Sequence, residues 1–205
     1  WLKADKRDAY IEELRGKHQK DIDRLRSATS PAELARLAKE LAAQIEKDVT
    51  PPNLASLVLL VEEDGKRVLL TGDAGDESLM RYLKRAGLLD AQGRIEVDVL
   101  KVPHHGADNS YSKSFVEAVR AAHYIFCGDG EHHNPEPDVV AGYIEAISKV
   151  PLSGGGRSTC HFNWSRARAK HHQMLWDEVE GQFTGAQHVS RVSLGPNDTR
   201  LTLDL

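Results

Sequence analysis

The chain has 205 residues, of which 27 are Lys or Arg and 31 are Asp or Glu, so its formal net charge is -4. Because the chain has no surplus of positive charge, this balance excludes the class of proteins that bind nucleic acid by charge alone. The length predicts one domain with a substantial core, and no apolar run is long enough to cross a membrane. Two cysteines, Cys127 and Cys160, favour a reducing compartment, which predicts a cytoplasmic protein.

Residues 1–50 have the pattern of a helical hairpin. The chain starts at Trp1 without an initiator methionine, and we expect it to be part of a longer protein. The amphipathic run 3–25 predicts one helix, and a second is expected to start at Ser30 as N-cap, with Glu33 closing a capping box. We interpret the hairpin as an inserted structural arm. The alternative is a substrate lid or a surface that docks a partner protein.

Residues 51–205 alternate between strand and helix patterns, which predicts an α/β domain. The runs 55–62 and 66–71 predict a β-hairpin, because Asp64-Gly65 between them is typical of a type I′ turn. The other expected elements are a helix over 77–86, a strand over 95–102, a helix over 112–121, a strand over 123–128, a helix through 140–147, a strand over 157–163, a helix over 165–183 and a terminal hairpin of 187–194 with 200–205.

Two candidate metal ligands follow the ends of expected strands. Asp73 comes directly after the apolar run that ends in Thr71-Gly72, and His104 and His105 come after Pro103, whose missing N–H stops strand pairing. Loops at strand ends are where α/β domains usually build their sites. A carboxylate and imidazoles that converge there predict a divalent metal, with zinc the best fit and manganese the next.

Two further polar features accompany this pair. Asp98 lies in a strand that is expected to be interior, and a buried carboxylate needs a partner. His132 and His133 lie in the polar loop 129–137. These two histidines face either an active-site cleft or solvent, and the sequence leaves both interpretations open.

Four segments together resemble the later half of the metallo-β-lactamase-fold hydrolases. They are 53–61, 69–73, 98–106 with its Val-Pro-His-His-Gly run, and 109–112. The resemblance is to the branch that contains the ComEC-type competence proteins and the phosphorylcholine esterases. It implies that residues 51–205 form the C-terminal half of an αββα sandwich that carries a dinuclear zinc site.

The resemblance also implies roles for individual residues. Asp73 matches the carboxylate that bridges both metals, and His105 matches a ligand of the second metal. His104 beside it matches a phosphate-contacting or second-shell group, and we expect it to be catalytic. The implied second-shell or substrate-binding residues are Asp98, Asn109, Ser110, His132 and His133. The family's His-x-His-x-Asp-His motif is absent from the sequence. The remaining ligands are therefore expected from an N-terminal half, as an upstream segment or a separate chain.

The resulting hypothesis is a metal-dependent hydrolase, a phosphodiesterase or nuclease. In such a site the water between two metal ions loses a proton near neutral pH, and the bridging hydroxide attacks a phosphate-containing substrate, possibly nucleic acid. The alternative is a non-catalytic regulatory or partner-binding module with half a metal site. A third possibility is hydrolysis of a lactone, lactam or thioester by the same metal chemistry.

Overall fold

The computed structural model describes residues 19, 23–37, 53, 56–169, 172–203 and 205. The chain divides into two compact units, Trp1–Thr50 and Pro51–Leu205, and the second is called the α/β unit below. Among the described residues, no helix is both long and apolar enough to cross a membrane.

In the first unit, the expected helix start at Ser30 is present. Residues 31–37 are helical, and the Ser30 hydroxyl accepts a hydrogen bond from the Glu33 N–H at 3.2 Å. The Glu33 carboxylate does not return to Ser30 but accepts from the backbone N–H and hydroxyl of Thr29, at 2.9 and 2.8 Å. These two bonds lower the pKa of Glu33. Most of the predicted hairpin over 1–50 lies outside the described residues.

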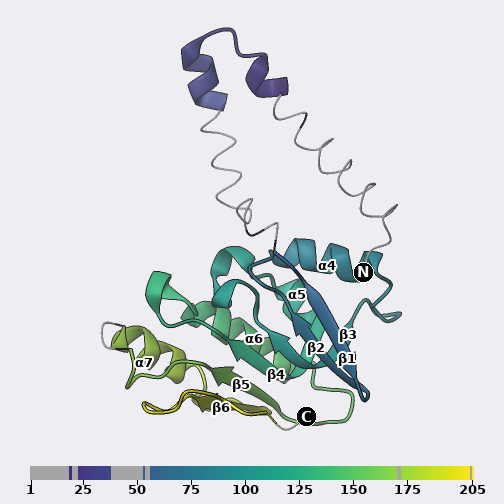
Figure 1. Ribbon diagram of the computed structural model, residues 1–205, viewed down its shortest axis with the longest axis vertical. Helices are drawn as coiled ribbons and strands as arrows, with labels where there is room; N and C mark the ends of the chain where they lie inside the picture. The colour runs from purple at the N-terminus through teal and green to yellow at the C-terminus, as the bar shows by residue number, and fades with distance from the viewer. Residues whose placement is uncertain (1–18, 20–22, 38–52, 54–55, 170–171, 204) are drawn as a thin grey trace. The chain divides into compact units, whose positions relative to one another are not determined.

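The α/β unit contains one mixed sheet of six strands (Figure 1). Its order is β1-β2-β3-β4-β5-β6, in which β1 and β2 are antiparallel and every other neighbouring pair is parallel. The strands are β1 Leu59–Glu63, β2 Lys66–Leu70, β3 Ile95–Lys101, β4 Val119–Phe126, β5 Ser158–Phe162 and β6 Val189–Ser193. The helices are α4 Asp76–Arg85, α5 Lys113–Ala118, α6 Pro137–Lys149 and α7 Gln173–Gly181, with short 3-10 helices η1 Pro103–Gly106, η2 Asp108–Ser110 and η3 Glu131–His133.

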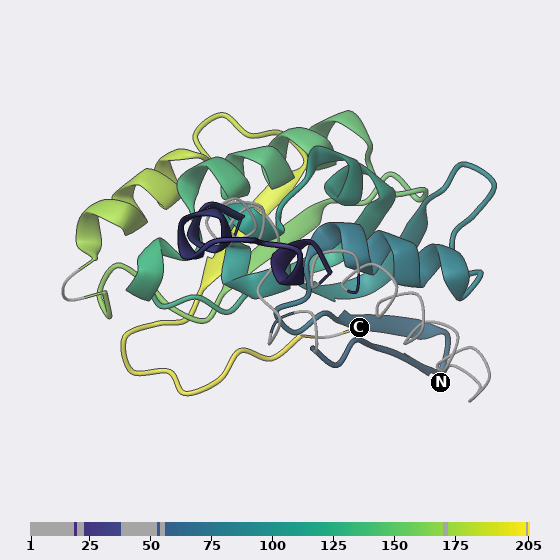
Figure 2. The same ribbon diagram turned by 90° about the horizontal axis from the view of Figure 1, so that it is seen from above.

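These four α-helices lie on one face of the sheet (Figure 2). Crossovers between parallel strands are right-handed, so a sheet whose strands follow in chain order receives every crossover helix on the same side. An aromatic cluster joins the two layers: Phe126 of β4 stacks on Phe162 of β5 at 4.9 Å, Tyr143 of α6 meets Phe126 at 5.5 Å, and Trp176 of α7 meets Phe162 at 5.7 Å. The core is therefore between the sheet and this helix layer.

The opposite face of the sheet keeps several large apolar side chains exposed. By strand alternation and register, Leu59, Val61, Leu70 and Val192 point away from the helix layer, and each is 38–45% exposed. Leu205 lines a shallow pocket together with Val61 on this part of the sheet. Parallel strands are normally covered on both faces, so this face has the composition of one that a second layer covers.

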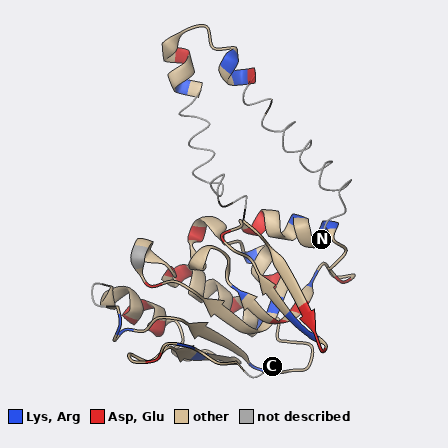
Figure 3. Ribbon diagram, in the orientation of Figure 1, with Lys and Arg blue, Asp and Glu red and all other residues tan. Residues whose placement is uncertain are grey.

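The β1–β2 hairpin is confirmed, with Asp64 and Gly65 at positive φ of 50° and 77° as a type I′ turn requires. The helix expected over 112–121 ends earlier, at Ala118, because the residues from Val119 onward pair with β3. Lys, Arg, Asp and Glu side chains are interspersed along the strands and helices of this unit (Figure 3).

Two expectations at the C-terminal end were wrong. The helix predicted over 165–183 begins only at Gln173, since 166–168 form a turn. The predicted terminal hairpin is not formed in the described part of 187–205. There β6 pairs in parallel with β5, and residues 200–203 contain no strand.

Candidate functional site

Two loops meet at one edge of the sheet because β2 and β3 are parallel neighbours. The loop after β2 carries Asp73, and the loop after β3 forms η1. Backbone groups tie the two loops together. The Thr71 hydroxyl donates to the carbonyl of Lys101 at 2.7 Å, and the N–H of His104 donates to the carbonyl of Gly72 at 3.2 Å. These two hydrogen bonds hold the loops together and leave the side chains of Asp73 and His105 free of this role.

Asp73 and His105 face each other across this edge. Asp73 Oδ1 lies 3.3 Å from His105 Nε2, and the two side chains are 36% and 41% exposed. The backbone N–H of Asp73 donates to the hydroxyl of Ser56 at 3.1 Å, which fixes the start of the loop. An oxygen and a nitrogen at this separation are placed so that both can bind one cation.

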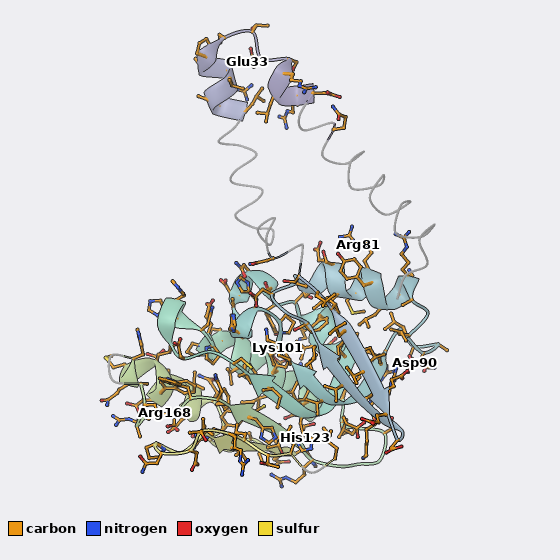
Figure 4. All side chains as sticks on the ribbon, in the orientation of Figure 1. Glu33, Arg81, Asp90, Lys101, His123 and Arg168 are labelled. Atoms are coloured by element: carbon orange, nitrogen blue, oxygen red, sulfur yellow. The ribbon has the colours of Figure 1, made fainter. Side chains whose placement is uncertain are left out.

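Lys101 is a member of the site that the sequence analysis did not assign. It is the last residue of β3, labelled in Figure 4, and its Nζ donates to the carbonyl of Gly72 at 2.6 Å. The same Nζ lies 3.5 Å from Asp73 Oδ1, so this ammonium offsets the charge of the carboxylate. A lysine in an otherwise buried strand was the sequence signal for this role.

Both ring nitrogens of His104 have hydrogen-bond partners. Its Nε2 lies 3.2 Å from the amide nitrogen of Asn53, and its Nδ1 lies 3.0 Å from Asn109 Oδ1 and 2.9 Å from Ser110 Oγ. Because an amide nitrogen only donates, Nε2 accepts, and Nδ1 carries the proton. In this arrangement His104 joins three segments of the chain, and Asn109 and Ser110 hold His104.

The backbone of the loop is left-handed at three consecutive residues. His104, His105 and Gly106 have φ of 45°, 61° and 87°. Such conformations are unfavourable for residues other than glycine and persist where the surroundings enforce them. At Gly106 a Cβ would lie 2.9 Å from the Cβ of Pro135, and its carbonyl accepts from the N–H of Glu136 at 3.0 Å. Pro135 and Glu136, in the loop after β4, therefore pack against Gly106 and stabilise the left-handed conformation in which His105 faces Asp73.

Asp98 does not belong to this site. Its carboxylate accepts from the Arg67 N–H at 2.8 Å and pairs with Lys66 at 3.2 Å, so both of its partners are on β2. The Arg67 bond, followed by Lys66, lowers its pKa despite partial burial. The partner that the sequence analysis expected for Asp98 is therefore on β2, where the carboxylate supports the pairing of β2 with β3.

His132 and His133 lie in η3, and both are exposed and have positive φ. Their loop touches the η1 loop through Glu136, whose carboxylate accepts from the Asp108 N–H at 2.9 Å. Their loop therefore contacts the segment after β3, but among the described residues neither ring joins Asp73 and His105 in a group of metal ligands.

The residues fit a cation in part. Within the described ranges, no group of three or more His, Cys, Asp and Glu side chains could hold a metal ion. Asp73 and His105 supply two suitable donors, so a complete site needs further ligands. His105 Nδ1 is buried with no hydrogen-bond partner among the described residues, although a ligating histidine normally donates from its other nitrogen.

Neither cysteine is poised to act as a ligand. Cys127 follows β4 at the same edge and is free, and burial raises the pKa of its thiol although Lys101 nearby lowers it. Cys160 is also free, and complete burial raises its pKa to about 12. Both thiols stay protonated at neutral pH.

No family model matches the chain. No curated protein and no solved structure matches it either.

Proposed function

We propose that residues 51–205 are the C-terminal half of a metallo-β-lactamase-like αββα sandwich, and that the assembled site is a zinc-dependent phosphodiesterase. The observation that carries the proposal is the 3.3 Å approach of Asp73 Oδ1 to His105 Nε2, between loops that are 32 positions apart in sequence. In this proposal Asp73 and His105 would hold the zinc ions, which would supply an activated water for hydrolysis. Manganese is the next candidate metal.

The chemistry of the two donors supports the proposal. Carboxylate oxygen and imidazole nitrogen suit zinc, and a pair of such cations, when bound, activates water and stabilises charge on a phosphoryl oxygen. Lys101 holds the Asp73 carboxylate and the Gly72 carbonyl in position. His104 stabilises the left-handed loop that presents His105, which makes it a positioning residue in this arrangement.

The sheet face opposite the helix layer supports the proposal that residues 51–205 are half of a sandwich. A layered domain with one helix layer and one sheet leaves an apolar sheet face that another layer buries. Leu59, Val61, Leu70 and Val192 are exposed on that face. We propose that the N-terminal half, as an upstream segment or a separate chain, covers it and brings the remaining metal ligands.

Metal analysis of the complete protein tests this proposal. The wild type is expected to hold two zinc ions and to hydrolyse bis-p-nitrophenyl phosphate. Asp73→Ala and His105→Ala are expected to lose zinc and to lower kcat/KM at least a hundredfold, while Asp64→Asn, at the exposed hairpin turn, leaves both unchanged. Zinc content and turnover that survive both site substitutions would overturn the proposal.

One observation favours a second candidate function. The described residues of this chain supply only two ligands at the site, which is the state expected of a non-catalytic regulatory or partner-binding module. That candidate predicts a protein that remains folded and binds its partner, yet has no hydrolytic activity even with the N-terminal half and zinc present. The same hydrolysis assay separates the two, and lactone, lactam and thioester substrates belong in its panel.

A further inference from the structure

A second pair of metal-binding side chains lies outside the Asp73 site. His123 of β4 and His161 of β5 point to the sheet face opposite the helix layer, and His123 Nδ1 lies 3.0 Å from His161 Nε2 (Figure 4 labels His123). The two rings are 5.1 Å apart and tilted by 50°. In the strand register Ile125 separates His161 from Lys101, so the pair does not share a residue with the edge that carries Asp73.

Both imidazoles are neutral at neutral pH. Burial, and after it the neighbouring His123, lower the pKa of His161 to about 4. Burial also lowers the pKa of His123, while Asp98 on β3 raises it and Lys66 on β2 lowers it. Only a neutral imidazole has a lone pair free for a metal, so protons do not compete strongly for these nitrogens at pH 7.

One nitrogen of the pair has no partner in any tautomer. His161 is 5% exposed, and its Nδ1 is buried without a hydrogen-bond partner among the described residues. Ligation through Nε2 requires the tautomer with the proton on Nδ1, where no existing bond is given up. The ion replaces the hydrogen bond between the two rings, and the proton of that bond moves to the other nitrogen of the ring that donated it. A buried polar group left unpaired calls for an explanation, and the fixed orientation of a ligand is one.

The spacing of the two nitrogens, which is that of a hydrogen bond between the rings, is also compatible with two neighbouring ligands of one ion. With metal–nitrogen bonds of about 2.0–2.1 Å, two nitrogens 3.0 Å apart subtend about 95° at a shared ion. This angle matches neighbouring positions of a tetragonal site, whereas a tetrahedral ion places its nitrogens about 3.3 Å apart. Tetragonal coordination by nitrogen and oxygen is typical of Cu²⁺ and Ni²⁺, and Cu²⁺ binds such donors more tightly.

We propose that His123 Nδ1 and His161 Nε2 together bind one Cu²⁺ ion on the open face of the sheet. In the 205-residue chain without a second layer over this sheet face, His123 is half-buried and gives the ion access from solvent. No third His, Cys, Asp or Glu completes the group in the described residues, so water fills the remaining positions and the ion exchanges readily. This inference does not depend on the proposed hydrolase activity, and it applies to the 205-residue chain while no second layer covers this sheet face.

Copper titration of the 205-residue chain tests the proposal, with Asp73→Ala/His105→Ala as the background so that the other site cannot bind the ion. One Cu²⁺ is expected per chain, with an electron paramagnetic resonance spectrum that shows coupling to two imidazole nitrogens. Adding His123→Gln or His161→Gln is expected to lower the affinity at least tenfold and to remove the coupling of one nitrogen.

The exposed histidine His188 supplies the control, since His188→Gln in the same background is expected to leave the affinity and the spectrum unchanged. Circular dichroism of His123→Gln verifies that this half-buried variant is folded. Equal copper affinity and an unchanged spectrum in the folded His123→Gln protein would overturn the proposal, and the pair would then be an ordinary imidazole–imidazole hydrogen bond.

Discussion

Acid is expected to destabilise the α/β unit through the His123–His161 pair. Burial, and then the charge of His123, hold the pKa of His161 at about 4, below its ordinary value of 6.5. Between pH 6.5 and 4 the unfolded chain therefore binds a proton at His161 that the folded chain does not. The stability contributed by the neutral ring is present above pH 6.5 and is lost as the pH falls toward 4.

The two pKa values set the size of the effect. Proton linkage with values of 6.5 unfolded and about 4 folded lowers the free energy of unfolding by about 2 kcal/mol between pH 7 and pH 5 for His161 alone. His123 acts in the same direction, because burial lowers its pKa too, although Asp98 opposes this shift. Most carboxylates remain ionised over this range and contribute little to the slope.

Guanidinium unfolding at pH 7, 6 and 5, with a chelator present, measures the effect. The wild type is expected to lose about 2 kcal/mol over the range, and His161→Gln is expected to lose much less, whatever its stability at pH 7. His188→Gln, at an exposed position, is expected to keep the wild-type slope. If His161→Gln keeps the full slope, the loss belongs to other groups and the assignment to this ring is refuted.

Three substitutions test contacts elsewhere in the α/β unit by urea unfolding. Gly128→Ala places a Cβ 2.5 Å from the carbonyl oxygen of Asn134 and is expected to cost about 1–3 kcal/mol; unchanged stability would show that this loop moves freely. Ser112→Ala removes the N-cap hydroxyl that accepts from the Phe115 N–H and is expected to cost about 1 kcal/mol, with no loss contradicting the cap. Asp98→Ala removes the acceptor of a β2 N–H and is expected to cost about 1–2 kcal/mol, whereas a stabilised variant would argue against this role.

Local chemistry was enough to predict the elements whose conformation depends on neighbours in sequence. Asp64-Gly65 specified the hairpin turn because the required positive φ values suit those residue types. The boundary between α5 and β4 could not be predicted, because it is set by the pairing of Val119 with Ile95 on β3. The parallel pairing of β6 was missed for the same reason, since a sequence pattern does not name a strand's partner.

The candidate site could also be predicted only in part from the sequence. The approach of Asp73 to His105 follows from strand ends and parallel pairing, which a sequence pattern can indicate. The bond from Asn53 to His104 joins residues 51 positions apart and depends on side-chain direction. The partners of Asp98 depend on how its carboxylate turns toward β2, so the sequence indicated only that some partner was needed.

The strand order of the sheet has a consequence for how the chain can fold during synthesis. Each strand from β2 to β6 joins the edge left by the strand before it, and no strand has to enter between two that are already paired. A sheet of this kind can lengthen in one direction as the ribosome releases each helix and strand, with only the newest edge waiting for its neighbour. The loops that carry Asp73 and His105 are complete once β4 and Glu136 have emerged, well before the last two strands are made.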